Sequence, residues 1–380
     1  MRVAIDVKST LKEKVTGIGS YTLRLIKALS SIDSHNSYLL FSHSGSFNSK
    51  ASFPLSDLPE NFYLREKRLS GKLLFFLLNK VRLPLDYFLG EVDIFQSTEA
   101  KYPHPKRAKL VYFLADVIPL VHPEFYEFQE VDSFRQQMRA LLDKADGLIT
   151  PSLSSQKDMA KFFPGFIKPV GVIPIGIEKE FRPLNGFNQN SFRRKYGLSK
   201  KIILSVGTLE RRKNFEVLLK AFKEIREKGL NYQLVIIGDK IKGSEKILNL
   251  SRDLGISREV VFTGYIPKED LVYFYNLAEV FVYPSVYEGY GLPPLEAMAC
   301  GLPVIVSRSS SLPEVVGESA LFFEPSEASD LSSRIETLLV SPGLREALKN
   351  KGFKRAKELS LEKMGRETVA FYGEILRRGV

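Results

Sequence analysis

Short apolar runs alternate along this chain with stretches of helical periodicity, and this alternation constrains the fold more than any other feature. Buried strands are expected at residues 3–7, 110–114, 148–150, 202–206, 234–237, 260–262, 280–283 and 304–306. Helices are expected between them, at residues 19–29, 215–226, 244–254, 268–277 and 294–299. Strands that alternate with helices in this way form parallel sheets with crossover helices. The sequence therefore predicts an α/β fold with a doubly wound order in each half.

The length of the chain indicates two domains. A chain of 380 residues is too long for one ordinary hydrophobic core. The boundary is expected near residues 174–190, where prolines and glycines interrupt regular structure and a polar stretch follows. Ligands of doubly wound domains bind at the carboxyl ends of the strands. A cleft between two such domains is therefore the expected binding site.

Composition excludes several classes of protein. The lone Cys300 rules out an internal disulfide framework and fits a reducing compartment. The four histidines and this cysteine show no metal-ligand spacing. Asp6 interrupts the first apolar run, which therefore reads as a strand and not as a signal peptide. The apolar residues 73–78 are far fewer than the roughly 20 that span a bilayer, so we expect a cytoplasmic protein, soluble or peripheral.

The formal net charge of +11 is spread over both halves of the chain. Such a global excess favours anionic partners weakly and specifies none of them. Nucleic acid is not supported as a partner, because the sequence contains neither zinc-finger spacing nor an aromatic RNA-binding signature.

Residues 284–301 combine two carboxylates, a glycine-rich turn and the start of a helix. Glycines and prolines prevent one continuous helix here, so Glu288 is expected on a loop after a strand. Glu296 is then expected in the first or second turn of the following helix. An anion at the positive end of that helix would meet the N–H groups of Gly289, Tyr290, Gly291 and Leu292. Two acids beside an anion site suit a ligand with both hydroxyls and phosphates, such as a sugar nucleotide.

A second candidate stretch, residues 206–214, begins at the end of an expected strand. Gly207 and Thr208 end this strand, and Asn214 is expected to cap the next helix through its side chain. Cations at the carboxyl end of a strand are well placed to hold a diphosphate. The cations of this stretch are Arg211, Arg212 and Lys213. A solvated basic turn is the alternative, which we would prefer if the two acids of the other stretch were absent.

These two stretches resemble ordered motifs of the retaining glycosyltransferases of family 4, which have the GT-B fold. Glu288 and Glu296 are similar to the E-x7-E signature of that family. Residues 206–214 look like the G-T-L-E-x-R-K-N phosphate-binding stretch of a mannosyltransferase-like branch, and residues 283–285 and 311–317 are also similar to it.

The resemblance implies two Rossmann-like domains that face each other across a cleft. Residues 1–177 would bind the acceptor and residues 178–360 the nucleotide sugar. Residues 361–380 would form a terminal helix that crosses back to the first domain. The sequence by itself indicates only a helix with two aromatic residues on an otherwise charged face.

The resemblance also assigns roles to the candidate side chains. Arg212 and Lys213 would bind the donor pyrophosphate and stabilise the charge on the leaving group. Glu288 would face the transferred sugar and stabilise positive charge at the anomeric carbon. Glu296 is expected to bind the ribose, because a carboxylate accepts hydrogen bonds from two adjacent hydroxyls. No second carboxylate pairs with Glu288 across a glycosidic bond, so hydrolysis is the weaker interpretation.

Other assignments have ordinary structural alternatives of similar weight. The base would contact backbone groups of Tyr265 and Ile266, which would otherwise form a plain strand-to-helix turn. Gly17 and Gly19 would let a first-domain loop approach donor and acceptor, although a helix start explains both glycines almost as well. Asp116 would orient the acceptor hydroxyl or cap a local turn. Relatives carry His where this chain has Ala115, which puts an imidazole role in doubt.

Neither a metal nor another cofactor is expected. The chain contains no Asp-x-Asp motif, the carboxylate pair that commonly holds a divalent ion on the phosphates. This agrees with the metal-free mode of GT-B enzymes, in which Arg, Lys and a helix dipole replace the ion.

Residues 63–84 are the best candidate for contact with an anionic membrane. Their basic residues surround the apolar run 73–78 and suit the surface of an anionic leaflet. These basic residues are Arg65, Lys67, Arg68, Lys72, Lys80 and Arg82. A core helix with solvated flanks is the alternative, and the sequence favours it slightly.

The sequence thus predicts a retaining glycosyltransferase. We favour mannose from GDP-mannose as the transferred group, and a hydroxyl of a polysaccharide or lipid-linked glycan as the acceptor. A UDP-glucose-type or other donor stays open. A catalytically inactive scaffold that binds sugar nucleotides is a further alternative, supported only by Ala115. A nicotinamide-dependent dehydrogenase lacks its G-x-G-x-x-G fingerprint.

Overall fold

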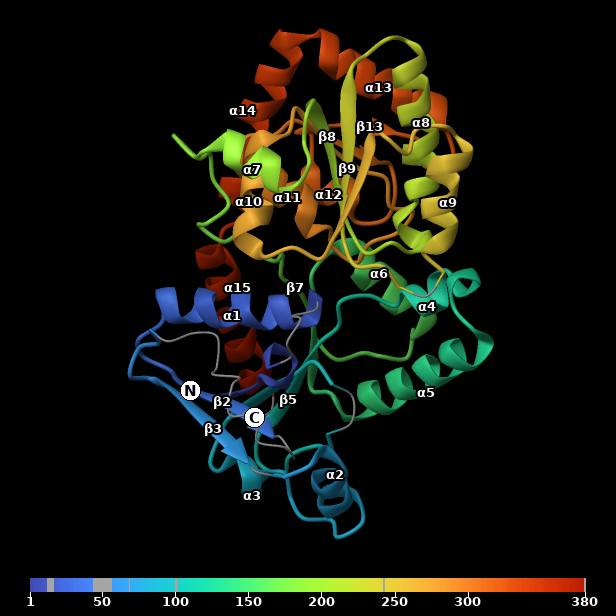
Figure 1. Ribbon diagram of the computed structural model, residues 1–380. Coiled ribbons are helices and arrows are strands. Elements are labelled where there is room, and N and C mark those ends of the chain that lie inside the picture. Colours follow the sequence, from blue (N-terminus) through green and yellow to red (C-terminus); the bar gives the residue numbers. More distant parts are fainter. Residues whose placement is uncertain (12–16, 44–56, 68, 100–101, 242, 379–380) are drawn as a thin grey trace. The chain divides into compact units, whose positions relative to one another are not determined.

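The computed structural model describes residues 1–11, 17–43, 57–67, 69–99, 102–241 and 243–378. The chain forms two compact units, of which the first comprises Met1–Gly176 and Ser360–Val380 and the second Ile177–Leu359. The last segment of the chain thus belongs to the first unit. Figure 1 shows that each unit is built around its own sheet.

The first unit contains a sheet of seven parallel strands in the order β3-β2-β1-β4-β5-β6-β7. Its central strands are buried on both faces, which explains the unbroken apolar runs of the sequence. The bounds are β1 Arg2–Asp6, β2 Ser37–His43, β3 Phe62–Lys67, β4 Ile94–Ser97, β5 Lys109–Phe113, β6 Gly147–Thr150 and β7 Val170–Val172. The order reverses between β1 and β4, as in doubly wound folds.

The helices of the first unit include one from the far end of the sequence. The bounds are η1 Lys8–Thr10, α1 Gly17–Ile32, α2 Gly71–Asn79, α3 Asp86–Leu89, α4 Ile118–Val121, η2 Pro123–Phe125, α5 Phe128–Lys144, α6 Leu153–Phe162 and α15 Leu361–Arg377. Helices α1 and α15 cross and pack against each other (Figure 1). A Cβ on Gly365 of α15 would lie 2.9 Å from the carbonyl oxygen of Ala28, so a glycine is needed for this close approach. The hydroxyl of Tyr372 also donates to Gln96 on β4, whose amide donates to Tyr21 of α1 at 2.9 Å.

The second unit contains a sheet of six parallel strands in the order β10-β9-β8-β11-β12-β13. The bounds are β8 Lys201–Val206, β9 Tyr232–Ile237, β10 Val260–Gly264, β11 Val280–Tyr283, β12 Val304–Ser307 and β13 Ala320–Phe323. This is the strand order of the dinucleotide-binding fold, and it reverses between β8 and β11. The predicted α/β class with a doubly wound order in both halves is confirmed.

The helices of the second unit connect these parallel strands. The bounds are α7 Gln189–Lys195, η3 Arg211–Lys213, α8 Phe215–Glu227, α9 Glu245–Asp253, α10 Lys268–Leu277, α11 Leu292–Ala299, α12 Leu312–Val316, α13 Ala328–Val340 and α14 Pro342–Glu358. Leu218 and Phe222 of α8 lie one turn apart and are fully buried in the core. The opposite side of α8 is charged, and this amphipathic pattern fixes which face covers the sheet.

None of the helices in the described part of the chain combines the length and apolar character needed to cross a bilayer.

Candidate functional site

Two loops of the second unit meet where its strand order reverses. One loop follows β8 and contains Arg212, and the other follows β11 and contains Val286. The N–H of Val286 donates to the carbonyl oxygen of Arg212 at 2.9 Å, which holds the two loops side by side. Ligands of open α/β sheets bind at this position, outside the carboxyl ends of the strands. The predicted cations and the first predicted acid are therefore brought together.

Two cations surround the carboxylate of Glu288. Lys213 Nζ lies 2.6 Å from Glu288 Oε1, and Arg212 Nη1 lies 2.9 Å from Oε2. Arg212 also contacts Glu210 through Nη2 at 2.5 Å and donates from Nη1 to the carbonyl oxygen of Tyr287 at 3.0 Å. The cluster thus contains two positive and two negative side chains, whose charges balance.

Tyr283 completes this cluster from the end of β11. Its hydroxyl donates to Glu288 Oε1 at 3.0 Å and accepts from Lys213 Nζ at 2.8 Å. The ammonium also lies 5.0 Å from the centre of the tyrosine ring, a cation–π distance. Lys213 and Glu288 are each only 8% exposed, so each is stabilised chiefly by these partners and little by water.

Burial and the oppositely charged neighbours shift the pKa values of these side chains in opposite directions. Burial alone would raise the pKa of Glu288, but the charges of Lys213 and Arg212 outweigh it and lower this pKa to about 2. Burial lowers the pKa of Lys213, against the opposing effect of Glu288. Burial also acts to lower the pKa of Arg212, but Glu288 and Glu210 outweigh it and raise this pKa above its usual value. Glu288 is therefore ionised at any physiological pH.

The backbone of Glu288 is held by the loop that follows β12. Its N–H donates to Ser310 Oγ at 2.8 Å, and its carbonyl oxygen accepts from Ser311 Oγ at 2.9 Å. Ser310 has a φ of 45°, an uncommon left-handed conformation for a residue other than glycine. Ser311 Oγ also donates to the carbonyl oxygen of Tyr290 at 2.7 Å. Hydroxyl groups from a third loop thus fix the position of the glutamate.

Asn214 stands at the start of the next helix as predicted, but its side chain has another role. It occupies the N-cap position of α8, but its φ of 55° places it in the left-handed region and its side chain makes no cap hydrogen bond. Its Nδ2 instead donates to the carbonyl oxygens of Pro284 at 3.1 Å and Pro325 at 2.8 Å. The predicted N-cap position is confirmed, but the side-chain amide binds backbone carbonyls after β11 and β13 and leaves the N–H groups of the helix uncapped by a side chain.

Glu296 lies in the second turn of α11, within the range expected from the sequence. It is 6% exposed, and its Oε2 accepts from the hydroxyl of Tyr275 on α10 at 3.1 Å. Helix α11 begins at Leu292 with two prolines in its first turn and Gly291 at the N-cap. Gly291 has a φ of 104°, a conformation that glycine adopts readily. Gly289 and Tyr290, which precede it, are buried beside Glu288.

Gly207 and Thr208 directly follow β8, as predicted. The N–H of Gly207 donates to the carbonyl oxygen of Ile237 at 2.8 Å and so extends the pairing of β8 with β9. A Cβ on Gly207 would lie 3.1 Å from the side chain of Lys213, which packs over this backbone. A Cβ on Gly238 would lie 1.9 Å from the carbonyl oxygen of Gly207, so only glycine fits there. The close backbone approach keeps the turn after β8 compact.

Tyr265 and Ile266 follow β10, at the same edge of the sheet but beyond β9. Tyr265 is 55% exposed, whereas Ile266 is buried. Gly264 ends β10 with a φ of 72°, which turns the chain toward α10. The structure places both residues on the expected side of the sheet.

Three predicted residues belong to the first unit. Gly17 is exposed at the first position of α1, and Gly19 is buried within this helix, whereas the preceding Thr16 lies outside the described residues. Asp116 follows β5, and its carboxylate accepts from the N–H of Ile118 at 3.1 Å, as a local turn requires. Ala115 accepts from Ser155 Oγ at 2.8 Å through its carbonyl oxygen.

Within the ranges that the structure describes, no group of three His, Cys, Asp or Glu side chains could hold a metal ion. Cys300 is buried at the end of α11, and burial raises the pKa of its thiol. This thiol is therefore an unreactive core group.

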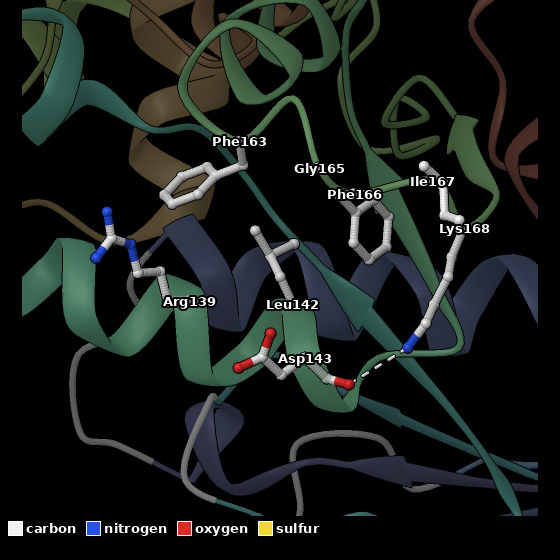
Figure 2. A pocket seen from close by; sticks show the side chains of 8 residues that line it. All are labelled: Arg139, Leu142, Asp143, Phe163, Gly165, Phe166, Ile167 and Lys168. Carbon is white, nitrogen blue, oxygen red and sulfur yellow. Dashed lines mark hydrogen bonds between the residues drawn. The ribbon is translucent and has the colours of Figure 1, made fainter.

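A separate hollow of about 370 Å³ lies in the first unit, between α5 and residues 163–168 (Figure 2). The rings of Phe163 and Phe166 face Leu142 of α5 across it, and Lys168 Nζ donates to the carbonyl oxygen of Asp143 at 3.3 Å. None of the site residues predicted from the sequence lines this hollow.

Sequence reasoning missed several residues that build the site. Glu210 and Tyr283 contact the cation cluster directly, and Ser310 and Ser311 fix the backbone of Glu288. Glu210, Tyr283 and Ser311 stand inside the motifs that carried the family resemblance, so a signal existed for them. Ser310 stands outside those motifs, and no sequence signal pointed to it.

Comparison with known proteins adds independent findings. Residues 188–355 match the family model of the glycosyl transferases group 1. The chain is similar to the O-antigen chain mannosyltransferase B of Escherichia coli, with 29% identity over 378 residues that cover 95% of this chain and 97% of that protein. It is also similar to the serotype-specific mannosyltransferase WbdA of Escherichia coli, with 32% identity over 250 residues. That match covers 63% of this chain but only 30% of the other protein.

The fold also has solved counterparts. Sucrose-phosphate synthase from Thermosynechococcus elongatus superposes with a TM-score of 0.78 at 21% sequence identity, and 99% of each chain is covered. Similarity at this level of identity concerns the fold alone. It confirms the predicted GT-B class, with its two Rossmann-like domains.

Proposed function

We propose that this chain, whose residues 188–355 match the family model of the glycosyl transferases group 1, transfers mannose from GDP-mannose with retention of configuration. The acceptor we propose is a hydroxyl group of a polysaccharide or a lipid-linked glycan. The names of the two Escherichia coli relatives support mannose as the transferred sugar. The observation that carries the proposal is the contact of Arg212 and Lys213 with Glu288 where the strand order reverses.

Donor binding would exchange partners within the charge cluster. In the free chain, Lys213 and Arg212 are neutralised by Glu288 and Glu210. An incoming diphosphate would take over hydrogen bonds that these carboxylates now accept. Arg212 offers a planar fork that binds two phosphate oxygens at once, and Lys213 acts as a compact point charge. The N-terminus of α11 adds backbone N–H groups and a positive dipole end beside them.

Glu288 would act on the transferred sugar once the diphosphate occupies the cations. In the free chain these cations lower its pKa to about 2 and the carboxylate is ionised. An ionised carboxylate can stabilise an oxocarbenium-like charge at the anomeric carbon. Arg212 and Lys213 would stabilise the negative charge that develops on the leaving diphosphate. In this front-face mechanism the leaving phosphate takes the proton of the attacking hydroxyl, and the acceptor oxygen bonds on the side that the phosphate leaves.

The other predicted residues would recognise the remainder of the donor and the acceptor. Glu296 would accept hydrogen bonds from the ribose hydroxyls, and the backbone of Tyr265 and Ile266 would contact the base. Gly17 and Gly19 would let their loop approach donor and acceptor, and Asp116 would orient the acceptor hydroxyl. We assign no metal to the reaction, because fixed cations and backbone N–H groups supply the positive charge that the phosphates need.

The proposal is tested by offering GDP-mannose, UDP-glucose and ADP-glucose to the purified chain in parallel thermal-shift assays. A ligand that binds only the folded state at roughly 100 times its Kd stabilises it by about 2.7 kcal/mol, so the correct donor raises Tm by several degrees. We expect GDP-mannose to give the largest shift. A larger shift with another sugar nucleotide would reassign the donor and leave the transferase function intact.

Product analysis tests the stereochemistry and the two alternatives. The proton NMR signal of the anomeric position should report the same configuration in product and donor, and an inverted product would contradict the proposed mechanism. Donor binding without transfer to any acceptor from a cell extract would favour an inactive scaffold. Binding of NADH, followed by its fluorescence, would favour a dehydrogenase.

A further inference from the structure

Among the residues that the structure describes, helix α2 leaves an apolar surface uncovered on the first unit. Leu73, Phe75, Phe76 and Val81, which directly follow or belong to this helix, are between 45% and 55% exposed. The helix packs onto the core through Leu74 and Leu78 on its other side, together with partly buried neighbours. The alternative that the sequence slightly favoured, a core helix with solvated flanks, therefore holds for Leu74, Leu78 and the exposed cations. It does not account for the two rings of the apolar run that point away from the core.

Lysines lie one turn before and one turn after the outermost ring of this surface. Lys72, Phe76 and Lys80 are spaced four residues apart and therefore share one side of the helix. This is the side opposite Leu74 and Leu78, and Lys72 and Lys80 are both exposed. Ser70 caps the start of the helix by accepting the N–H of Leu73 at 3.1 Å, which fixes where this pattern begins.

The charged residues of α2 and of the short stretches on either side of it all have the same sign. From residue 69 to residue 85 the sequence contains three cations and no Asp or Glu. The three are Lys72, Lys80 and Arg82, and all are exposed. Arg82 has a φ of 60°, a strained conformation that turns the chain sharply after the helix. Arg68 of the predicted basic flank lies outside the described residues.

An anionic bilayer surface matches this combination of side chains better than a second protein copy does. A two-fold pairing through the same surface would bring the cations of both copies together, where like charges repel. Lipid headgroups of negative charge would instead neutralise these cations while the rings enter the boundary of the acyl chains. The long lysine stems can lie along the apolar surface with their ammonium groups at headgroup level.

We infer that α2 and residues 80–82, here called the α2 surface, dock this chain on an anionic lipid bilayer. The helix would lie in the plane of the interface and not cross it. The inference goes beyond the proposed function and does not depend on it, because it uses neither donor nor acceptor.

Vesicle flotation without any sugar nucleotide tests the inference. The full chain is mixed with vesicles of phosphatidylcholine alone, or with an equal mixture of phosphatidylcholine and phosphatidylglycerol. We expect binding to the mixed vesicles and little to the neutral ones. Binding should weaken at about 1 M salt, where the Debye length falls to about 3 Å.

Two matched double variants separate this surface from exposed apolar residues in general. Phe75→Ser with Phe76→Ser should weaken binding to mixed vesicles about tenfold or more, because the rings no longer enter the interface. Phe128→Ser with Ile167→Ser removes two even more exposed apolar side chains, at 85% and 91%, that lie outside the α2 surface. We expect this control to bind as the wild type does.

A charge variant gives an independent result if the ring variant folds poorly. Lys72→Glu with Lys80→Glu should weaken binding at least about twentyfold, because each cation near an anionic surface contributes about fivefold. Circular dichroism confirms that both variants are folded, as expected for exposed positions.

Three outcomes would overturn the inference. The wild type could fail to float with mixed vesicles, or the ring variant and its control could bind equally well. The wild type could also form a dimer in light scattering that the Phe75→Ser, Phe76→Ser variant converts to a monomer, without vesicle binding in either. The last result would assign the α2 surface to a second copy of the chain.

Discussion

Lys213 and Glu288 are both nearly enclosed by protein, and neither would remain charged there alone. Removing a single charge from water favours its neutral form, as the lowered pKa of Lys213 shows. Arg212 and Tyr283 add hydrogen bonds to the same carboxylate, so the cluster acts as one unit. A change at one member should therefore alter its neighbours, and single substitutions need a paired variant to be interpreted.

We predict that Glu288→Gln lowers both turnover and stability. Turnover should fall by orders of magnitude, because the charge beside the anomeric carbon is lost. The free energy of unfolding should fall by about 3–5 kcal/mol, because Lys213 would remain buried without its anionic partner. Urea unfolding measures this loss.

The double variant Glu288→Gln, Lys213→Met provides the decisive comparison. It should recover most of the lost stability but none of the activity, because the uncompensated buried charge is gone. Glu336→Gln breaks an exposed pair with Lys228 and should change stability by less than about 1 kcal/mol. A double variant no more stable than Glu288→Gln would contradict the ion-pair account.

The pKa of Glu288 also predicts a pH dependence of stability. This pKa is lowered from 4.5 to about 2 in the folded chain, so the unfolded state binds protons first as the pH falls. The stabilisation is fully present above about pH 4.5 and is lost progressively toward pH 2. We expect the difference in unfolding free energy between wild type and Glu288→Gln to shrink by up to about 3 kcal/mol over this range. A difference independent of pH would show that the carboxylate is not held in its charged form.

For single residues, the sequence selected side chains that the structure brings together, but it did not predict their contacts with one another. The resemblance selected Arg212, Lys213 and Glu288. It assigned the two cations to phosphate binding and the acid to the transferred sugar. The pairing of Lys213 with Glu288 joins residues 75 positions apart and depends on β8 lying beside β11. No local spacing encodes such a contact. The side-chain contacts of Asn214, which is the predicted N-cap, have the same origin, because its partners belong to distant loops.

Among the structural elements, α11 depends on the glycine at its N-cap. A Cβ at Gly291 would lie 2.6 Å from Leu312 Cδ2, at a φ of 104° that other residues rarely adopt. We predict that Gly291→Ala costs about 1–3 kcal/mol of stability and weakens donor binding, because the helix start shifts. Thermal unfolding with and without GDP-mannose measures both effects.

Gly343→Ala in α14 is the matched control for this element. A Cβ there would meet nothing within 4 Å, and its φ is not in the left-handed region. The control should be neutral or gain up to about 1 kcal/mol. Equal effects of the two substitutions would mean that the start of α11 is not constrained as described.

Some elements followed from the sequence, among them α8, α10 and the short strands β11 and β12, whereas α5, α14, β2 and β7 were not predicted. Helices α8 and α10 lie within a residue or two of the expected ranges, because their apolar residues recur at helical spacing. Strand β7 has only three residues with a glycine in the middle, which carries almost no pattern. Strand β2 contains a short buried run that periodicity cannot distinguish from a helix segment. This run can be assigned to a strand only when the strands beside it are known.

For the molecule as a whole, the return of the chain to the first unit matters most. Helix α15 packs against α1 so closely that Gly365 faces the backbone at Ala28. We predict that Gly365→Leu destabilises the first unit by about 2 kcal/mol or more and leaves the second unit unchanged, because a side chain there must displace backbone. Hydrogen exchange measured segment by segment would show lost protection in the first unit only.

Gly373→Leu tests whether the effect belongs to this contact. It introduces the same side chain into α15, where a Cβ meets only the flexible end of Arg377 at 3.4 Å. We expect exchange rates close to those of the wild type. Loss of protection in both units after Gly365→Leu would contradict the division of the chain into separately stabilised units.

The central claim is that fixed cations of the second unit hold the diphosphate of a nucleotide sugar without a metal. Calorimetric titration with GDP-mannose in excess chelator tests it most directly, using the wild type, Lys213→Met and the control Lys223→Met on the exposed side of α8. We predict that the wild type and the control bind equally, and that Lys213→Met binds roughly tenfold to hundredfold more weakly, the range for a lost charged hydrogen bond. Unchanged affinity in Lys213→Met, or wild-type binding that disappears with the chelator, would contradict the claim.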